Sequence, residues 1–309
     1  MEILLQCFLL FIGFVMLIKG ADWFVDGSSG IATKFKIPQL VIGLTIVAMG
    51  TSAPEAAVSI TAALKGNADI TVGNIVGSNI LNILIILGLS SLITPLAVAK
   101  STIKIEIPFM IAVTLLLLAM GYDGTITLLE GIILLLVFLL YLGYLFILAK
   151  KDMNNEEEPK DISVWKSLIW TVVGLFLIVW GSSITVDAAT KLALFLGLSE
   201  RFIGLTIVAL GTSLPELFTS VSAARKGNAD IAIGNIVGSN IFNILFVVGT
   251  TAMITPVAFA HGFLIDSAIA LAAGLILWFG VMKEQKLKKT LGIVMLIGYA
   301  VYFVYLLMG

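Results

Sequence analysis

The chain contains the same 54-residue segment twice. Residues 42–95 and 203–256 align without a gap at an offset of 161 residues, and 36 of the 54 aligned positions are identical. The same offset pairs Gly20 with Gly181 and Asp26 with Asp187, so the duplication extends toward the beginning of each half. Any fold of this chain must therefore accommodate two related units.

Composition places both units in a membrane. Of the 309 residues, 60% are hydrophobic and 12% are charged, whereas soluble domains carry about twice that charged fraction. A helix that crosses a bilayer needs about 20 mostly apolar residues. We therefore expect an all-α integral membrane protein with ten transmembrane helices, at residues 3–25, 38–63, 70–94, 103–121, 125–149, 165–191, 202–224, 231–254, 260–281 and 289–308.

Each half holds five of these segments, and an odd number of spans makes the second half enter the membrane from the opposite side. We therefore expect two inverted five-helix repeats, 1–149 and 167–309, joined by a polar cytoplasmic linker at 150–166. Inverted repeats are a known plan of transporters, with the substrate site near the midplane where the repeats meet. We also expect the chain to function as a monomer in the lipid bilayer.

Lysine and arginine predict the orientation, because they are more frequent in cytoplasmic loops. With the N-terminus outside, the outer loops hold only Lys65, Lys191 and Arg201. The inner loops then hold fourteen basic residues: Lys34, Lys36, Lys100, Lys104, Lys150, Lys151, Lys160, Lys166, Arg225, Lys226, Lys283, Lys286, Lys288 and Lys289. We therefore predict a multi-pass protein of the cell membrane with both termini outside. The net charge of −1 lacks the excess of basic residues that is typical of nucleic-acid-binding proteins, so we expect no nucleic-acid partner.

Two carboxylates fall within the predicted spans, where ionisable groups are rare because they are costly. Glu55 and Glu216 each end a Gly-Thr-Ser-x-Pro-Glu run in the second predicted helix of their half. Pro54 and Pro215 lack a backbone N–H, so the carbonyl four residues earlier loses its partner and the preceding turn is strained. Unpaired backbone at membrane depth is tolerated only where it lines a cavity. The motif therefore offers carbonyls, hydroxyls and a carboxylate within one turn.

The third predicted helix of each half adds further oxygen atoms. Ser78 and Asn82 are four residues apart and share a helix face, as do Ser239 and Asn243. A set made only of oxygen suits Ca²⁺, which takes about 6–8 oxygen ligands. Two carboxylates balance its charge, and they could equally share two or three Na⁺. The alternative is that the glutamates are satisfied helix-end groups and the small residues serve packing, but the match of both copies favours a cation site.

The repeated motifs resemble a known family. Gly-Thr-Ser-Ala-Pro-Glu (50–55) and Gly-Thr-Ser-Leu-Pro-Glu (211–216), with Gly-Asn-Ile-Val-Gly-Ser-Asn-Ile-Leu-Asn (73–82) and Gly-Asn-Ile-Val-Gly-Ser-Asn-Ile-Phe-Asn (234–243), resemble the alpha repeats of the cation/calcium exchanger superfamily. The whole chain looks like a prokaryotic sodium/calcium exchanger. This resemblance implies an antiporter that moves Ca²⁺ against Na⁺ by alternating access, with both ions as substrates and no cofactor.

The resemblance also implies roles for individual residues. Glu55 and Glu216 would chelate Ca²⁺ with help from the carbonyls of Thr51 and Thr212. The first helix of each half would slide as a gate. Sodium would use the two glutamates together with four serine hydroxyls and two alanine carbonyls, those of Ser52, Ser213, Ser78, Ser239, Ala48 and Ala209.

The amides at Asn82 and Asn243, which the resemblance places at the border of the central position, bear on the coupling ion. Potassium-dependent members of the superfamily carry Asp where Asn243 stands, so two amides predict independence from K⁺. Proton/calcium exchangers usually place a Glu near both positions, and this sequence has none there. A sibling antiporter that uses H⁺ or another cation pair remains the alternative.

Two other classes fit the sequence less well. A passive channel needs a continuous pore, usually built from rings of identical subunits, whereas an internal inversion favours two-sided access within one chain. An enzyme needs a positioned nucleophile and base, but the only histidine, His261, lies in a predicted loop near the outer face. We therefore expect no enzyme activity. We interpret Asp26 and Asp187 as helix-end polar groups and not as ligands.

Overall fold

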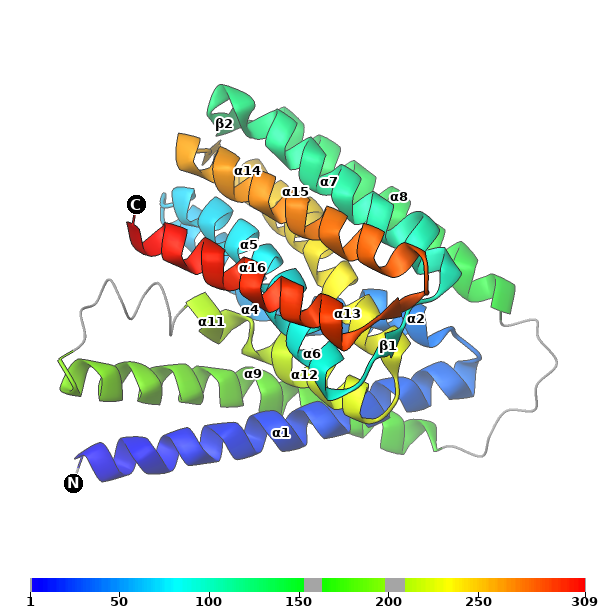
Figure 1. The fold of residues 1–309 in the computed structure, drawn as a ribbon. Coiled ribbons are helices and arrows are strands. Elements are labelled where there is room, and N and C mark those ends of the chain that lie inside the picture. Colours follow the sequence, from blue (N-terminus) through cyan, green and yellow to red (C-terminus); the bar gives the residue numbers. More distant parts are fainter. Residues whose placement is uncertain (1, 153–162, 198–208, 309) are drawn as a thin grey trace.

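A computed structural model describes residues 2–152, 163–197 and 209–308, and this part of the chain is almost entirely helical (Figure 1). Within these ranges eight helices are long and apolar enough to cross a membrane, or nine if the bent pair at 39–51 and 53–64 is one span. A multi-pass membrane protein was predicted, and the helices agree with it. The predicted span at 202–224 lies partly outside the described residues, so the count of ten stays a prediction.

The first half runs from α1 to α8. Its helices are α1 (Glu2–Phe35), α2 (Gln39–Ile42), α3 (Ala48–Thr51), α4 (Ala53–Leu64), α5 (Asp69–Leu81), α6 (Gly88–Ile93), α7 (Ile107–Met120) and α8 (Leu128–Asp152). Wider π-helical turns at Gly43–Val47, Asn82–Leu87 and Thr102–Glu106 join several of them, and a short 3₁₀ turn at Gly121–Asp123 follows α7. The strands are β1 (Leu96–Ala97) and β2 (Thr125–Ile126).

The second half repeats this order where it is described. Its helices are α9 (Val164–Phe195), α11 (Ala209–Thr212), α12 (Leu214–Arg225), α13 (Ala229–Phe242), α14 (Gly249–Ile254), α15 (His261–Met282) and α16 (Lys289–Met308). A π-helical segment, Asn243–Val248, joins α13 to α14. The strands are β3 (Val257–Ala258) and β4 (Lys286–Leu287).

α1 and α9 pack against each other along much of their length and lie at one side of the molecule (Figure 1). Glycines permit this contact, because a Cβ on Gly20 would lie 2.9 Å from the carbonyl oxygen of Gly174, and one on Gly181 would lie 3.1 Å from that of Gly13. Both helices are longer than the predicted spans 3–25 and 165–191. The apolar runs end at those residues, but no proline interrupts the first helix before Pro38.

The short strands link the two halves. β1 pairs with β4 through Leu96 and Leu287, and β2 pairs with β3 through Ile126 and Val257, both in antiparallel register. Adding the repeat offset of 161 to the residue numbers of β1 and β2 gives those of β3 and β4, since 96 + 161 = 257 and 126 + 161 = 287. The two sheets are therefore equivalent under the sequence repeat. Each half therefore contributes one strand to each sheet, and the contacts between the halves are reciprocal.

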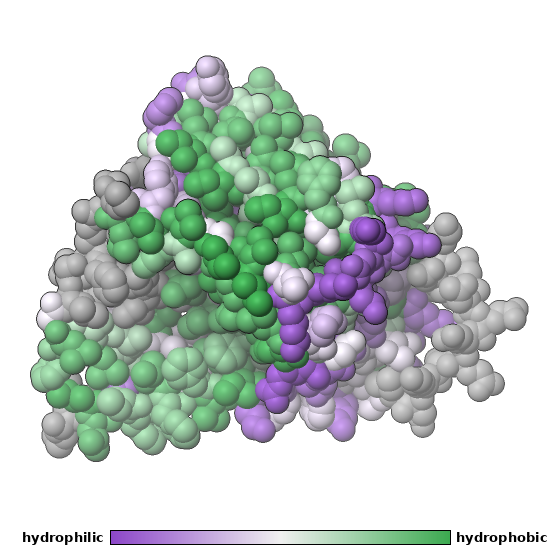
Figure 2. Space-filling model, in the orientation of Figure 1, coloured by the Kyte–Doolittle hydropathy of each residue, from purple (hydrophilic) through white to green (hydrophobic). Residues whose placement is uncertain are grey.

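The surface and the centre of the molecule differ as expected for a protein in lipid. Figure 2 shows apolar residues over most of one face, while hydrophilic residues gather in a band and at one tip. Outer helices expose large apolar side chains such as Leu140 on α8 (75% exposed) and Val301 on α16 (66%). Residues 231–245, in α13 and the start of the π-helical segment that follows it, are all buried and form the centre.

Candidate ion-binding site

Each Gly-Thr-Ser-x-Pro-Glu motif interrupts its helix at the serine. Ser52 (φ −81°, ψ 6°) separates α3 from α4, and Ser213 (φ −90°, ψ 5°) separates α11 from α12. Between residues 39–51 and 53–64 the helix axis bends by 47°. Proline in the first turn of α4 and α12 explains the break, because its ring clashes with the preceding turn and it has no N–H. Glu55 and Glu216 follow at once, and both are buried.

The two carboxylates are held by serines of the opposite half. Ser52 Oγ donates to Glu216 Oε1 over 2.7 Å, and Ser213 Oγ lies 3.2 Å from Glu55 Oε1. Ser213 Oγ also lies 3.3 Å from Ser78 Oγ. These contacts bring the motifs of both halves into one buried cluster, although their residues are about 160 positions apart in the sequence.

Four carboxylate and amide oxygen atoms of the predicted site residues have no hydrogen-bond partner among the described residues. They are Glu55 Oε2, Glu216 Oε2, Asn82 Oδ1 and Asn243 Oδ1. All four side chains are at most 1% exposed, and a buried polar atom without a partner normally costs about 1–3 kcal/mol. The four atoms can only accept when the carboxylates are ionised. A set of buried acceptor atoms suits a cation.

A pair of asparagines that sequence reasoning missed keeps the two amide oxygens free. Asn82 Nδ2 donates to Asn240 Oδ1 and Asn243 Nδ2 donates to Asn79 Oδ1, both over 3.0 Å. Asn79 and Asn240 in turn donate to each other's backbone carbonyl over 3.2 Å. We call Asn79 and Asn240 the asparagine brace. Because the brace occupies the NH₂ groups of Asn82 and Asn243, their oxygens remain for a ligand.

The sequence signal for the brace is that its asparagine recurs in both copies of the motif Gly-Ser-Asn-Ile-x-Asn, a property that it shares with many packing residues. A second missed pair joins the glutamate helices to the third helix of the same half. Asn74 Nδ2 lies 3.3 Å from the carbonyl oxygen of Glu55, and Asn235 Nδ2 lies 3.4 Å from that of Glu216. These bonds fix the helix turn from which each carboxylate projects.

The two halves are not equivalent at the motif threonines and carbonyls. Thr51 Oγ1 donates to Asn235 Oδ1 over 3.0 Å, whereas Thr212 Oγ1 has no partner within the described residues. The carbonyl of Ala48 accepts the Ser52 N–H at 3.0 Å and lies 3.4 Å from Ser239 Oγ. The Ala48 carbonyl is therefore already engaged by donors of the protein. Its counterpart in the second half belongs to Ala209, the first residue of α11.

The Gly211 carbonyl, which loses its backbone partner because Pro215 has no N–H, accepts a side-chain hydrogen bond instead. Ser182 Oγ of α9 donates to the Gly211 carbonyl over 2.7 Å. At the equivalent place α1 carries Ala21, which has no hydroxyl (182 − 161 = 21). One helix of the α1–α9 pair thus contacts the motif turn directly through a hydrogen bond.

Close packing of helices brings the predicted site residues together. A Cβ on Gly238 would lie 2.8 Å from both the Cβ of Ala48 and the carbonyl oxygen of Leu44, so only glycine lets α13 reach α3. Asn82 and Asn243 each begin a π-helical segment. Such wider turns are rare in proteins, and those that occur are often found at functional sites.

Fold and cluster together define a multi-pass membrane protein with a buried, oxygen-only site to which two related halves contribute. A model of the family described as sodium/calcium exchanger protein matches residues 5–147 and 166–308. The chain therefore belongs to this family of exchangers, which are transporters and not enzymes in the catalytic sense.

Individual relatives cover nearly the whole chain. The protein CaxA of Alkalimonas amylolytica is 44% identical over 287 residues, which are 90% of each chain. The sodium/calcium exchanger MaX1 of Methanosarcina acetivorans is 31% identical and covers 96% of this chain and 97% of its own. Among solved structures, the sodium-calcium exchanger NCX_Mj superposes with a TM-score of 0.87 at 33% identity, covering 98% of this chain and 99% of the other.

Proposed function

We propose that this chain is an antiporter that exchanges Na⁺ for Ca²⁺ by alternating access to the cluster around Glu55 and Glu216. The observation that carries the proposal is the set of four unpartnered, buried acceptor oxygens on Glu55, Glu216, Asn82 and Asn243. Two carboxylates supply a charge of −2, which balances one Ca²⁺ or two Na⁺. The names of MaX1 and NCX_Mj agree with this pair of ions.

Both ions can use the same atoms in different numbers. Ca²⁺ would take the free carboxylate oxygens with the carbonyls of Thr51 and Thr212, since it needs many hard oxygen ligands. Na⁺ would add the serine hydroxyls. A hydroxyl that donates its hydrogen to a carboxylate, as Ser52 does to Glu216, keeps lone pairs for a cation. Further oxygens proposed for Na⁺ are those of Ser213, Ser78, Ser239, Ala48 and Ala209.

The proposal includes ten membrane spans arranged as two inverted repeats, residues 1–149 and 167–309, with the linker 150–166 between them. Three features support it. The stretches that match the family model begin 161 residues apart (166 − 5), the serine–glutamate and asparagine contacts are reciprocal at that offset, and each two-stranded sheet takes one strand from each half. From the distribution of Lys and Arg we propose a cell-membrane protein with both termini outside, functional as a monomer.

Uptake of ⁴⁵Ca²⁺ into proteoliposomes tests the coupling ion. Vesicles loaded in turn with Na⁺, with K⁺ or with an acidic buffer are diluted into medium that lacks the loaded ion. We expect uptake only in Na⁺-loaded vesicles, and uptake should reverse when the Na⁺ gradient is reversed. Uptake driven by the acidic interior alone would assign H⁺ as the coupling ion. Calcium flux that depends only on the Ca²⁺ gradient, and on no gradient of Na⁺, K⁺ or H⁺, would indicate a channel.

A further inference from the structure

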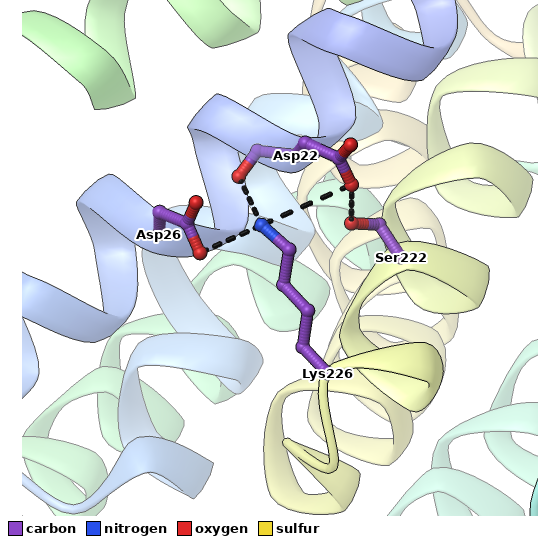
Figure 3. A network of polar contacts seen from close by, with 4 residues as sticks. All are labelled: Asp22, Asp26, Ser222 and Lys226. Atoms are coloured by element: carbon purple, nitrogen blue, oxygen red, sulfur yellow. Dashed lines mark hydrogen bonds and ion pairs between the residues drawn. The ribbon is translucent and has the colours of Figure 1, made fainter.

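A polar network outside the ion-binding cluster ties α1 to the end of α12 (Figure 3). Lys226 Nζ lies 2.6 Å from Asp26 Oδ1 and 3.8 Å from Asp22 Oδ1, and it donates to the carbonyl of Asp22 over 2.7 Å. Ser222 Oγ donates to Asp22 Oδ1 over 2.6 Å. Asp22 and Asp26 are four residues apart on one face of α1, so both can reach the same lysine.

The network connects two parts with different roles. Lys226 follows the last residue of α12, the helix whose first turn carries Glu216. α1 packs mainly along α9 through small residues, which let the two helices approach closely as a pair. Phe14 of α1 also contacts Phe218 of α12, with ring centroids 6.2 Å apart. A contact between α1 and α12 therefore resists any movement of α1 relative to the ion-binding helices.

The sequence repeat supplies a second set of these groups that is not engaged. Asp187 and Lys65 are exposed, and neither has an ion-pair partner among the residues that the structure describes. α12 packs closely on α1, but α4 makes no comparably extensive contact with α9. Subtracting or adding 161 gives the counterparts of Lys226, Asp26, Asp22 and Ser222 as Lys65, Asp187, Ser183 and Thr61.

We propose that Lys226 with Asp22 and Asp26 forms a latch that closes one side of the site, and that Lys65 with Asp187 forms the matching latch when the other side closes. This inference rests on the proposed antiport function. Under the proposed orientation the latch present in the structure closes the cytoplasmic side. Sliding of α1 and α9 breaks one ion pair and makes the other, so the two latches are never closed together.

The latches are unequal, and the difference sets the resting state. Ser183 stands where the closed latch has Asp22, so the second latch has one carboxylate fewer. Ion pairs of this exposure are individually weak, since Lys226 and Asp26 are 27% and 42% exposed. We expect the state with Lys226 engaged to be favoured by about fivefold, as one additional partly exposed carboxylate allows. The bias is small enough for ion binding to reverse it.

Distance measurements on spin labels test the latches directly. In a background without the native cysteine, labels at Phe35, near the end of α1, and at Lys104, before α7, report the position of α1 by double electron–electron resonance. Lys226→Met should raise the population of the second distance several-fold, and Lys65→Met, the matched control, should lower it. Ser183→Asp gives the second latch its missing carboxylate and should raise that population without touching the existing ion pair.

The outcomes separate the latch from the antiport proposal. Populations that are the same in Lys226→Met, Lys65→Met and the parent would overturn the latch, whatever ions are transported. A shift toward the second distance in Lys65→Met would overturn it too. Shifts in the expected directions in a protein without Na⁺-driven Ca²⁺ uptake would support the latch and refute only the proposed coupling. Monodisperse elution of each variant checks that it is folded.

Discussion

Removing one negative charge from the site, by Glu55→Gln or Glu216→Gln, should abolish calcium transport without unfolding the protein. Glutamine has the same shape as glutamate, and its carbonyl oxygen can take the place of the free Oε2. Its NH₂ group can then donate to the serine that now donates to Oε1, since Ser213 and Ser52 can accept as well as donate. The buried network is therefore preserved with the direction of one hydrogen bond reversed.

The loss of charge is the only large change, and its size can be estimated. Two unit charges 4 Å apart interact by about 4 kcal/mol at an effective dielectric constant near 20, so a divalent ion loses about 8 kcal/mol. Ion binding also displaces the water that hydrates the carboxylate while the site is open, at a cost of several kcal/mol that the variant avoids. The net loss is about 4 kcal/mol, or a factor of roughly 10³ in affinity.

The assay is ⁴⁵Ca²⁺ uptake into Na⁺-loaded proteoliposomes, together with calcium affinity of the purified protein. Glu106→Gln is the matched control, because Glu106 is also fully buried, receives a hydrogen bond from Tyr144 and lies outside the cluster. We expect near-normal transport in the control and none in Glu55→Gln or Glu216→Gln. Transport at the parent rate in either site variant would refute the assignment of both carboxylates to the substrate.

Three further predictions concern the coupling ion, the gate and the packing. Because Asn82 and Asn243 are both amides, exchange should proceed at the same rate when choline replaces K⁺ on both sides; a requirement for K⁺ would contradict this. A bis-thiol bridge between cysteines at Phe14 and Phe218 should stop exchange yet preserve Ca²⁺ binding. A bridge between α1 and α9 should leave exchange intact. Full exchange in the protein bridged at Phe14 and Phe218 would exclude a sliding α1. Gly238→Val should lower thermal stability by about 1–3 kcal/mol, measured by unfolding in detergent, because the added atoms meet the backbone of the opposite half; unchanged stability would show that α13 can shift.

Much of the candidate site could be predicted from local sequence. Pro54 and Pro215 require a break in the helix wherever they occur, because the missing N–H and the ring act within one turn. The break is found at the serine before each first turn, in agreement with the motif. The helix ends were predicted less well, since α1 continues to Phe35 beyond its apolar run. Hydropathy measures what faces lipid, whereas a helix ends where its backbone hydrogen bonds end.

The asparagine brace shows why repetition alone could not reveal every functional residue. Asn79 and Asn240 are identical in the two copies, but so are many packing residues of the same segment. Only the contact between copies distinguishes them, because each brace residue bonds to groups about 160 positions away. The sequence shows Ala21 at the position equivalent to Ser182, but only the packing of α9 shows that the Ser182 hydroxyl reaches the Gly211 carbonyl.

The sequence by itself determined that the chain crosses a membrane, that it holds two related units, and that two carboxylates lie beside helix-breaking prolines. These properties follow from local composition and backbone chemistry, which do not depend on distant residues. Tertiary structure alone decided that Ser52 serves Glu216 and not Glu55, that the amide oxygens of Asn82 and Asn243 stay free, and that Lys226 reaches α1. In a duplicated chain each polar group has two equivalent candidate partners, one in each half, and only the packing of the helices brings one of them within hydrogen-bond distance.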